Sequence, residues 1–298
     1  MRLSLQTILN TKMRFKARYF FLLFTLIAFS ITLLSFQQKK TEIGNRDLIN
    51  KIFESIANIK TLRYSLQCHE RIKGKLQKTE SKVKLQTSPR KLYLSLKGPE
   101  VLWIQGANNG DALVNPGAFP YINLNLDPYG SIMRKDQHHT IHEMGFQYLV
   151  DILKDRIKEL GDKADRYFAI TGEEKYDGRN CYKLLITFPE FAYGPYTVKK
   201  GENLTTIARR LRISEYLVLE NNPKLSWYND VKEGQIIQVP NAYAKMTLLL
   251  IDKELFLPVS NKIYDDKGIF EMYDYTNLQV NPDIAPEEFT RNFPGYNF

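Results

Sequence analysis

The sequence predicts an α+β protein in which an antiparallel sheet packs against helices and carries a small inserted module. Short strand-like segments separated by Gly, Pro and Asn turn residues run from residue 61 to about residue 125, which is typical of consecutive hairpins. In residues 91–96 polar and apolar side chains alternate, so one face of the sheet is expected to be apolar and the other solvated. Residues 46–58 and 142–160 repeat apolar side chains at helical spacing, which predicts two amphipathic helices.

Strand-like segments lie on both sides of residues 196–240. This stretch is therefore expected to be an insertion into a larger β domain formed by residues 45–195 and 241–298. Prolines bound the stretch, with Pro189 and Pro195 before it and Pro240 at its end, as expected for short linkers at a sheet edge. The flanking segments are residues 166–174 and 180–188 before the insertion, and residues 244–252, 258–265 and 269–278 after it.

The first 40 residues predict a signal peptide or a membrane anchor. Five basic residues and no acidic residue occur in the first 38 positions, and residues 19–36 form an uncharged, mainly apolar run. That run is at the short end of what spans a bilayer and is long for the core of a signal peptide. The preceding cations favour a cytoplasmic N-terminus. The run is expected to form an N-terminal hydrophobic helix, and the chain after Gln37 is expected to be exported. No clear small-x-small cleavage signal precedes Gln37, and both alternatives stay open.

The net charge of +9 does not predict nucleic-acid binding. Without the five N-terminal cations, the remaining 37 basic and 33 acidic residues differ by only four. No basic stripe is interleaved with aromatic residues in the manner that follows phosphates. The two cysteines, Cys68 and Cys181, each lie in a strand-like segment and either pair in an oxidising compartment or remain buried thiols.

Residues 196–240 have the order strand, helix, helix, strand. The opening strand reaches a turn at Gly201, the second helix ends at Asn222-Pro223, and a turn at Gly234 leads into the closing strand. This order and spacing resemble the LysM family of carbohydrate-binding modules. The resemblance implies a βααβ fold and a partner glycan containing N-acetylglucosamine, as in peptidoglycan or chitin.

The LysM resemblance also implies a shallow groove between two loops. Gly201 allows a tight turn, so that peptide groups face the acetamide of the sugar, while Leu204 and Pro223 are expected to give apolar contact. Glu202 and Asn203 stand where the family more often has Asp and Thr, a departure that concerns side-chain more than backbone contacts. A LysM that folds without binding glycan is the alternative. The glycan-binding residues are expected to be Gly201, Glu202, Asn203, Leu204 and Thr205 in the first wall and Asn222, Pro223, Lys224 and Leu225 in the second.

The surrounding β domain resembles an uncharacterised family of exported bacterial proteins with a fold like the lipoprotein-carrier (LolA-like) half-barrel. That resemblance implies a curved antiparallel sheet wrapped on helices, with an apolar cavity for acyl chains, and hence a lipid or lipoprotein partner. The motifs that carry it are residues 126–130, the His-rich run from Gln137, residues 257–259 and 264–268, Asn281-Pro282, Phe289 and residues 296–298.

The densest group of ionisable residues is Asp136, His138, His139, His142 and Glu143. His139 and His142 lie about one helical turn apart and could share a metal ion. The HExxH order of zinc proteases is absent and no cysteine lies nearby, so a helix N-terminus with ordinary polar residues is the favoured interpretation. Neither a metal nor a cofactor is expected.

No motif of a known enzyme class occurs, since a G-x-S-x-G elbow, a P-loop and a Rossmann glycine pattern are all missing. The expected function is therefore that of a non-enzymatic cell-envelope protein in the bacterial periplasm, attached to the inner membrane if the N-terminal segment is retained. Its LysM would bind peptidoglycan and its β domain a lipid or lipoprotein. The alternatives are a peptidoglycan hydrolase targeted by LysM and an envelope scaffold that docks a partner protein.

Overall fold

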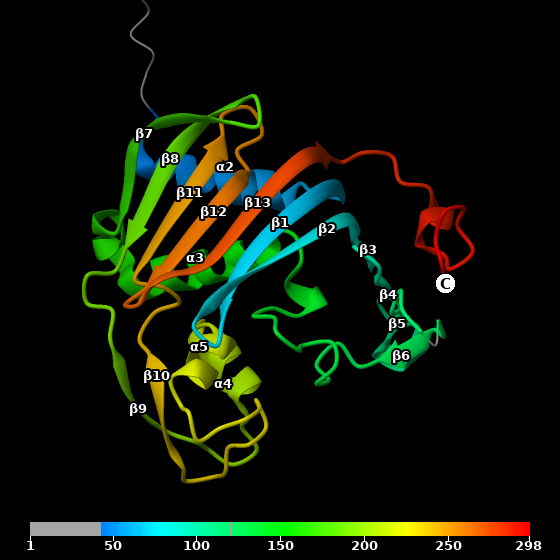
Figure 1. The fold of residues 1–298 in the computed structure, drawn as a ribbon. Helices are drawn as coiled ribbons and strands as arrows, with labels where there is room; N and C mark the ends of the chain where they lie inside the picture. The colour runs from blue at the N-terminus through cyan, green and yellow to red at the C-terminus, as the bar shows by residue number, and fades with distance from the viewer. Residues whose placement is uncertain (1–42, 120) are drawn as a thin grey trace, which may run out of the picture. The chain divides into compact units, whose positions relative to one another are not determined.

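The computed structural model describes residues 43–119 and 121–298, and an eleven-stranded antiparallel sheet dominates them (Figure 1). The strand order is β6-β5-β4-β3-β2-β1-β13-β12-β11-β8-β7, so most neighbours are also consecutive in sequence. Local hairpins therefore build most of this sheet. The strands are β1 Thr61–Ile72, β2 Lys75–Thr87, β3 Arg90–Leu96, β4 Glu100–Ile104, β5 Ala112–Asn115, β6 Leu124–Leu126, β7 Phe168–Tyr176, β8 Arg179–Thr187, β11 Met246–Asp252, β12 Pro258–Asp265 and β13 Gly268–Val280.

Two hairpin turns show why the sequence folds this way locally. Lys73 and Gly74 connect β1 to β2 with φ values of 50° and 79°, and Asp177 and Gly178 connect β7 to β8 with 47° and 74°. Two consecutive residues with positive φ make the turn whose twist matches that of paired strands. Local sequence therefore favours both of these hairpins.

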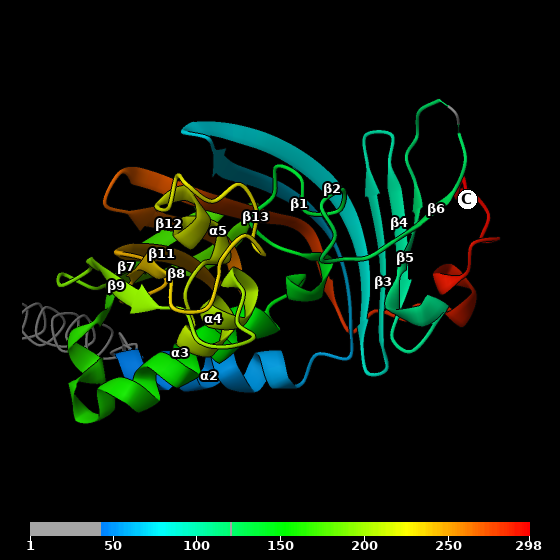
Figure 2. The ribbon, with the colours of Figure 1, turned by 90° about the horizontal axis from the view of Figure 1, so that it is seen from below.

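Two helices lie on the same side of the curved sheet, α2 (Asn45–Ala57) and α3 (Gln147–Leu160) (Figures 1 and 2). Their buried side chains repeat at helical spacing, and β1 alternates between more and less buried residues, as a strand with one covered face does. The expected α+β class, with an antiparallel sheet curved over helices, is confirmed. The buried helical residues are Leu48, Ile49, Ile52 and Ile56 in α2 and Val150, Ile152 and Leu153 in α3.

The second helix begins later than the spacing predicted, at Gln147 instead of His142. A separate turn of 3-10 helix, η2 (Ile141–Glu143), comes first and is capped by Thr140. Gly145 then interrupts the chain with φ 92°, and a Cβ atom there would lie 2.8 Å from a Leu85 methyl group. The close approach of the backbone to the sheet therefore divides the predicted helix.

Residues 196–240 contain a separate small fold. Strands β9 (Tyr193–Thr197) and β10 (Ile236–Pro240) pair antiparallel, and helices α4 (Leu204–Leu211) and α5 (Glu215–Glu220) lie between them in the chain. The expected βααβ order is confirmed. Its core is buried and apolar, and it includes Val198, Leu204, Ile207, Ala208, Ile213, Val218, Leu225, Tyr228, Val231 and Ile237.

The cysteines are both free and buried. Cys68 lies on β1 and Cys181 on β8, and three strands separate β1 from β8 in the sheet. At about 4.8 Å per strand step the two residues are roughly 19 Å apart, which is far beyond bridging distance. Burial raises the pKa of the Cys181 thiol to about 11 and also raises that of Cys68.

The predicted signal peptide or anchor at residues 1–40 lies outside the described residues. In residues 43–119 and 121–298, no helix combines the length and apolar character needed to cross a membrane.

Candidate functional site

The first predicted wall of the glycan groove is the loop between β9 and α4. Gly201 is exposed and has φ 76°, with no atom within 4 Å of the position a Cβ would take. Glu202 is held by its own module, because it accepts hydrogen bonds from the Tyr196 hydroxyl at 2.7 Å and the Lys199 N–H at 2.9 Å and pairs with Arg210 at 2.9 Å. Glu202 therefore shapes the loop, and the exposed turn at Gly201 leaves its peptide groups open to a ligand.

The next three residues have different roles. Asn203 caps α4 by accepting a hydrogen bond from the Thr206 N–H at 2.8 Å. Thr205 donates to Glu215 at 2.9 Å and accepts from Arg134 of the β domain at 3.0 Å. The Leu204 side chain is 0% exposed in the module core, so the apolar contact expected from it is wrong for its side chain.

The second predicted wall follows α5. The Asn222 amide is used internally, because it donates to the backbone oxygens of Val218 and Gln238 and accepts from the Gln238 N–H at 2.8 Å. Pro223 and Lys224 are exposed, while Leu225 is buried in the module core. Only the middle of this wall therefore presents side chains to solvent.

A polar cleft of about 300 Å³ adjoins the first wall and contains Asn203 and Thr205. Its other LysM residues come from α4 and from the segment after the second wall, and the β domain supplies its remaining side. Sequence reasoning missed these residues, although Trp227 in a polar loop was a signal for a sugar-stacking surface. The adjacent Tyr228 is buried in the module core. The additional lining residues are Asp127, Tyr129, Arg134, Arg209, Trp227, Tyr228 and Asn229.

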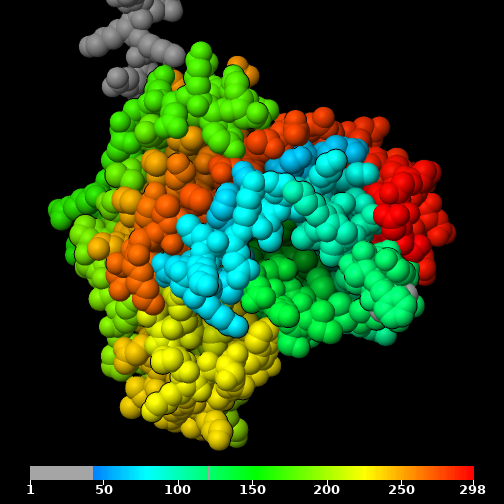
Figure 3. All heavy atoms as spheres, viewed as in Figure 1, coloured from blue at the N-terminus to red at the C-terminus, as the bar shows by residue number. Residues whose placement is uncertain are grey.

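Ion pairs join the LysM region to the β domain, and those of Arg71 and Arg134 are largely buried. Tyr216 on α5 also accepts a hydrogen bond from the Lys73 N–H at 3.0 Å, where the yellow atoms of the module meet the cyan turn between β1 and β2 (Figure 3). A charge removed from water is stabilised only by a close partner of opposite charge. These contacts therefore fix one arrangement of the LysM region on the β domain. The pairs are Arg71–Glu220 at 2.8 Å, Arg134–Glu215 at 2.6 Å and Arg209–Glu143 at 2.9 Å.

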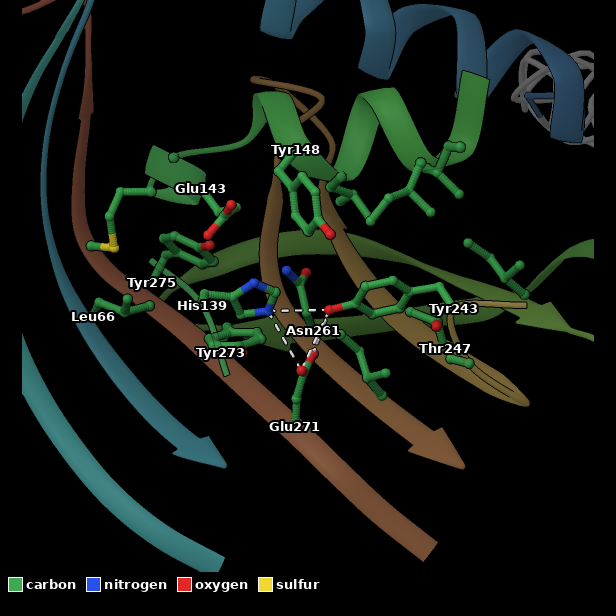
Figure 4. Close-up of a pocket in the computed structure, with 18 of the residues that line it drawn as sticks. Leu66, His139, Glu143, Tyr148, Tyr243, Thr247, Asn261, Glu271, Tyr273 and Tyr275 are labelled. Atoms are coloured by element: carbon green, nitrogen blue, oxygen red, sulfur yellow. Dashed lines mark hydrogen bonds and ion pairs between the residues drawn. The ribbon is translucent and has the colours of Figure 1, made fainter. Parts of the chain in front are cut away.

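A second site lies between the sheet and α3, where the structure has a cavity of about 120 Å³ (Figure 4). Strands β1, β8, β11, β12 and β13 and helix α3 contribute its walls, so it opens on the covered face of the sheet. Most lining side chains are apolar or aromatic, which suits the body of an apolar ligand. They include Leu66, Tyr148, Leu149, Ile152, Leu153, Ile186, Phe188, Thr247, Ile263 and Tyr275.

One wall of the cavity is polar and charged. The His139 Nε2 atom lies 3.1 Å from the Tyr243 hydroxyl and 3.4 Å from Glu271, and Tyr243 donates to Glu271 at 3.1 Å (Figure 4). Burial alone would lower the pKa of His139, but the charge and hydrogen bond of Glu271, together with the charges of Glu70 and Glu143, raise that pKa. Burial alone would raise the pKa of Glu271, but His139 and the hydrogen bond from His138 lower it. The geometry therefore favours a buried ion pair at neutral pH.

Of the three histidines near residue 139, His138 and His139 both contact Glu271, while His142 packs elsewhere. His138 contacts Glu271 at 2.8 Å through Nδ1 and the Arg71 backbone oxygen at 2.9 Å through Nε2, so both ring nitrogens are occupied. His142 packs against Trp103 and Tyr129. In residues 43–119 and 121–298, no three His, Cys, Asp or Glu side chains are arranged to hold a metal ion.

Two family models match the chain. The model described as "Protein of unknown function (DUF1571)" matches residues 59–200, and the LysM domain model matches residues 196–240. No curated protein matches the sequence significantly.

Several solved structures are similar to the chain at low identity. MucB is 11% identical with a TM-score of 0.39 over 83% of this chain, which spans 62% of the MucB chain. The lipoprotein LppX of Mycobacterium tuberculosis is 11% identical with a TM-score of 0.38, over 81% of this chain and 99% of LppX. LprF of Mycobacterium bovis is 11% identical with a TM-score of 0.36, over 81% of this chain and 95% of LprF.

All three TM-scores are below 0.5, so the architecture rests on the strand order and register of the chain itself. The LysM match begins within β9 and runs to the end of β10, so it includes both helices of the small βααβ fold. The chain thus carries a LysM domain, a glycan-binding module, at residues 196–240, together with a β domain that the DUF1571 family model recognises over residues 59–200.

Proposed function

We propose that this protein is a non-enzymatic component of a bacterial cell envelope that binds the N-acetylglucosamine glycan of peptidoglycan and holds an apolar ligand, a lipid or the acyl chain of a lipoprotein. The LysM domain at residues 196–240 is the observation that carries this proposal. The glycan site is formed by the exposed turn at Gly201 and the walls proposed from residues 201–205 and 222–225. An N-terminal anchor or signal peptide at residues 1–40 would place both sites outside the cytoplasm.

Replacing Gly201 by alanine is expected to weaken glycan binding. The αL backbone of Gly201 costs a residue with a Cβ about 1–2 kcal/mol, so the turn that presents the peptide groups will shift. Gly234→Ala is the matched control, because Gly234 has φ 78° and an equally open Cβ position but belongs to neither proposed wall. Both variants should lose similar stability in urea.

Chitin oligomers titrated into the full-length protein provide the measurement. Amide resonances of residues 201–205 and of Asn222, Lys224 and Leu225 should shift in the wild type and in Gly234→Ala, with a several-fold weaker affinity in Gly201→Ala. Unchanged amide resonances in the wild type would contradict the glycan function.

The apolar cavity supports the second part of the proposal. The uncharged fluorophore N-phenylnaphthylamine should bind the full-length protein saturably, and Thr247→Trp should abolish that binding because Thr247 lines the cavity. Thr276→Trp is the control: Thr276 pairs with Ser65 and follows the cavity-lining Tyr275 on β13, so its side chain points to the other face of the sheet. Binding that is absent from the wild type, or equally reduced in both variants, would count against an apolar ligand in this cavity.

Turnover separates this function from that of a LysM-targeted hydrolase. The protein incubated with purified peptidoglycan should sediment with it and release no soluble muropeptides. An envelope scaffold would instead bind a partner protein equally well when Thr247→Trp fills the cavity.

A further inference from the structure

Asn261 gives the wall of the cavity a buried polar group whose bonding capacity is unused. Asn261 lies on β12 and is 6% exposed, yet its Oδ1 atom has no hydrogen-bond partner among the described residues. Its side chain lines the cavity and is directed into it (Figure 4). A buried amide oxygen without a partner costs about 1–3 kcal/mol, so its presence on the wall of a cavity points to a ligand that donates to it.

The cationic side chains that line the cavity, His139 and Arg156, are already paired with carboxylates. His139 is paired with Glu271 at 3.4 Å, Glu143 with Arg209 at 2.9 Å, and Arg156 with Glu159 at 2.9 Å. A carboxylate head placed here would lose its hydration without gaining an unpaired positive partner, and it would lie near Glu271. The electrostatics therefore disfavour an ionised fatty acid.

An uncharged hydroxyl suits the Asn261 amide instead. The amide presents an acceptor oxygen and a donor NH₂ group, and a hydroxyl both donates and accepts, whichever way the amide is oriented. The apolar remainder of the wall, including Leu149, Ile152 and Leu153, suits the chain attached to such a head. The two halves of the cavity thus match the two halves of an amphiphile.

We propose that the cavity binds an uncharged acyl lipid with a hydroxyl-bearing head, of the acylglycerol class, and that Asn261 selects the head. This assignment rests on the proposed apolar-ligand function and adds the chemistry of the ligand. Asn261 contacts the head, while the His139–Glu271 pair excludes an anionic one.

Displacement of the uncharged fluorophore N-phenylnaphthylamine from the full-length protein at about pH 7.5 tests the assignment. Monomyristoylglycerol should displace the probe at a roughly tenfold lower concentration than either myristate or methyl myristate, because only the glyceride satisfies the amide as donor and acceptor without a charge. This comparison uses the wild type alone and depends on no variant.

Asn261→Leu, which is close in shape, should bind monomyristoylglycerol and methyl myristate equally and should melt no lower than the wild type, because it removes an unsatisfied buried group. Tyr64→Phe is the matched control. Tyr64 also lines the cavity, and its hydroxyl has no partner. Cys68 on β1 and Asn261 on β12 both pair with Tyr273, so they lie at the same level of the sheet. Tyr64 is four residues from that level, or roughly 13 Å along β1, so the glyceride preference should remain in Tyr64→Phe.

The outcomes distinguish the two proposals. Equal displacement by all three lipids, stronger displacement by myristate, or a glyceride preference that survives Asn261→Leu overturns the head-group assignment alone. Displacement by none of the three lipids overturns both that assignment and the apolar-ligand function.

Discussion

Replacing Glu271 by alanine is expected to lower the free energy of unfolding by roughly 3–5 kcal/mol, since removing one partner of a buried ion pair leaves the other uncompensated. The Glu271 side chain is 0% exposed and accepts contacts from His138 at 2.8 Å, His139 at 3.4 Å and Tyr243 at 3.1 Å. Without it, the two histidines lose their shared anion. Urea denaturation followed by far-UV circular dichroism measures the change.

Glu80→Ala is the control for the Glu271 variant. Glu80 also lies on the large sheet and pairs with Lys78 at 2.7 Å, but its side chain is 42% exposed. Solvent screens such a pair, so the loss of stability should be far smaller than in Glu271→Ala. A Glu271→Ala variant as stable as Glu80→Ala would show that the buried pair contributes little.

The same pair predicts a pH dependence. The pKa of Glu271 is lowered from 4.5, so its contribution is complete above that value and is lost as the pH falls through its folded-state pKa. The pKa of His139 is raised from 6.5, so its contribution is complete below that value and is lost as the pH rises through its folded-state pKa. The stability difference between the wild type and Glu271→Gln should therefore be largest between pH 4.5 and 6.5.

Replacing Arg71 by alanine is expected to cost a similar roughly 3–5 kcal/mol and to loosen the LysM domain from the sheet. Arg71 at the end of β1 pairs with Glu220 of α5 at 2.8 Å and with Asp265 at the end of β12, and its side chain is 8% exposed. Both carboxylates would lose their guanidinium partner. Hydrogen exchange of the α5 amides should accelerate together with the loss of stability in urea.

Arg46→Ala is the matched control for Arg71. Arg46 pairs with Asp165 at 2.8 Å, but the two side chains are 54% and 59% exposed, so less than about 1 kcal/mol should be lost. Slow exchange of the α5 amides retained in Arg71→Ala would contradict the view that this buried arginine holds the LysM domain in place.

The local parts of the candidate sites were predictable. The turn at Gly201, the cap at Asn203 and the end of the second helix at Asn222 each depend on a few neighbouring residues. It was harder to predict from the sequence which side chains face a ligand. Leu204 and Leu225 belong to the small core, because a module of this size must bury most of its apolar residues.

The sequence by itself determined the hairpins, the two amphipathic helices and the LysM domain, because turn residues and apolar spacing act over a few positions. The tertiary structure alone decided the start of α3 at Gln147, the cavity and its ionised wall. His139 and Glu271 are 132 positions apart, and Asn261 reaches the same cavity from another strand. Charge pairing and the lack of a partner for a buried amide depend on three-dimensional packing between distant segments, which no local pattern in the chain records.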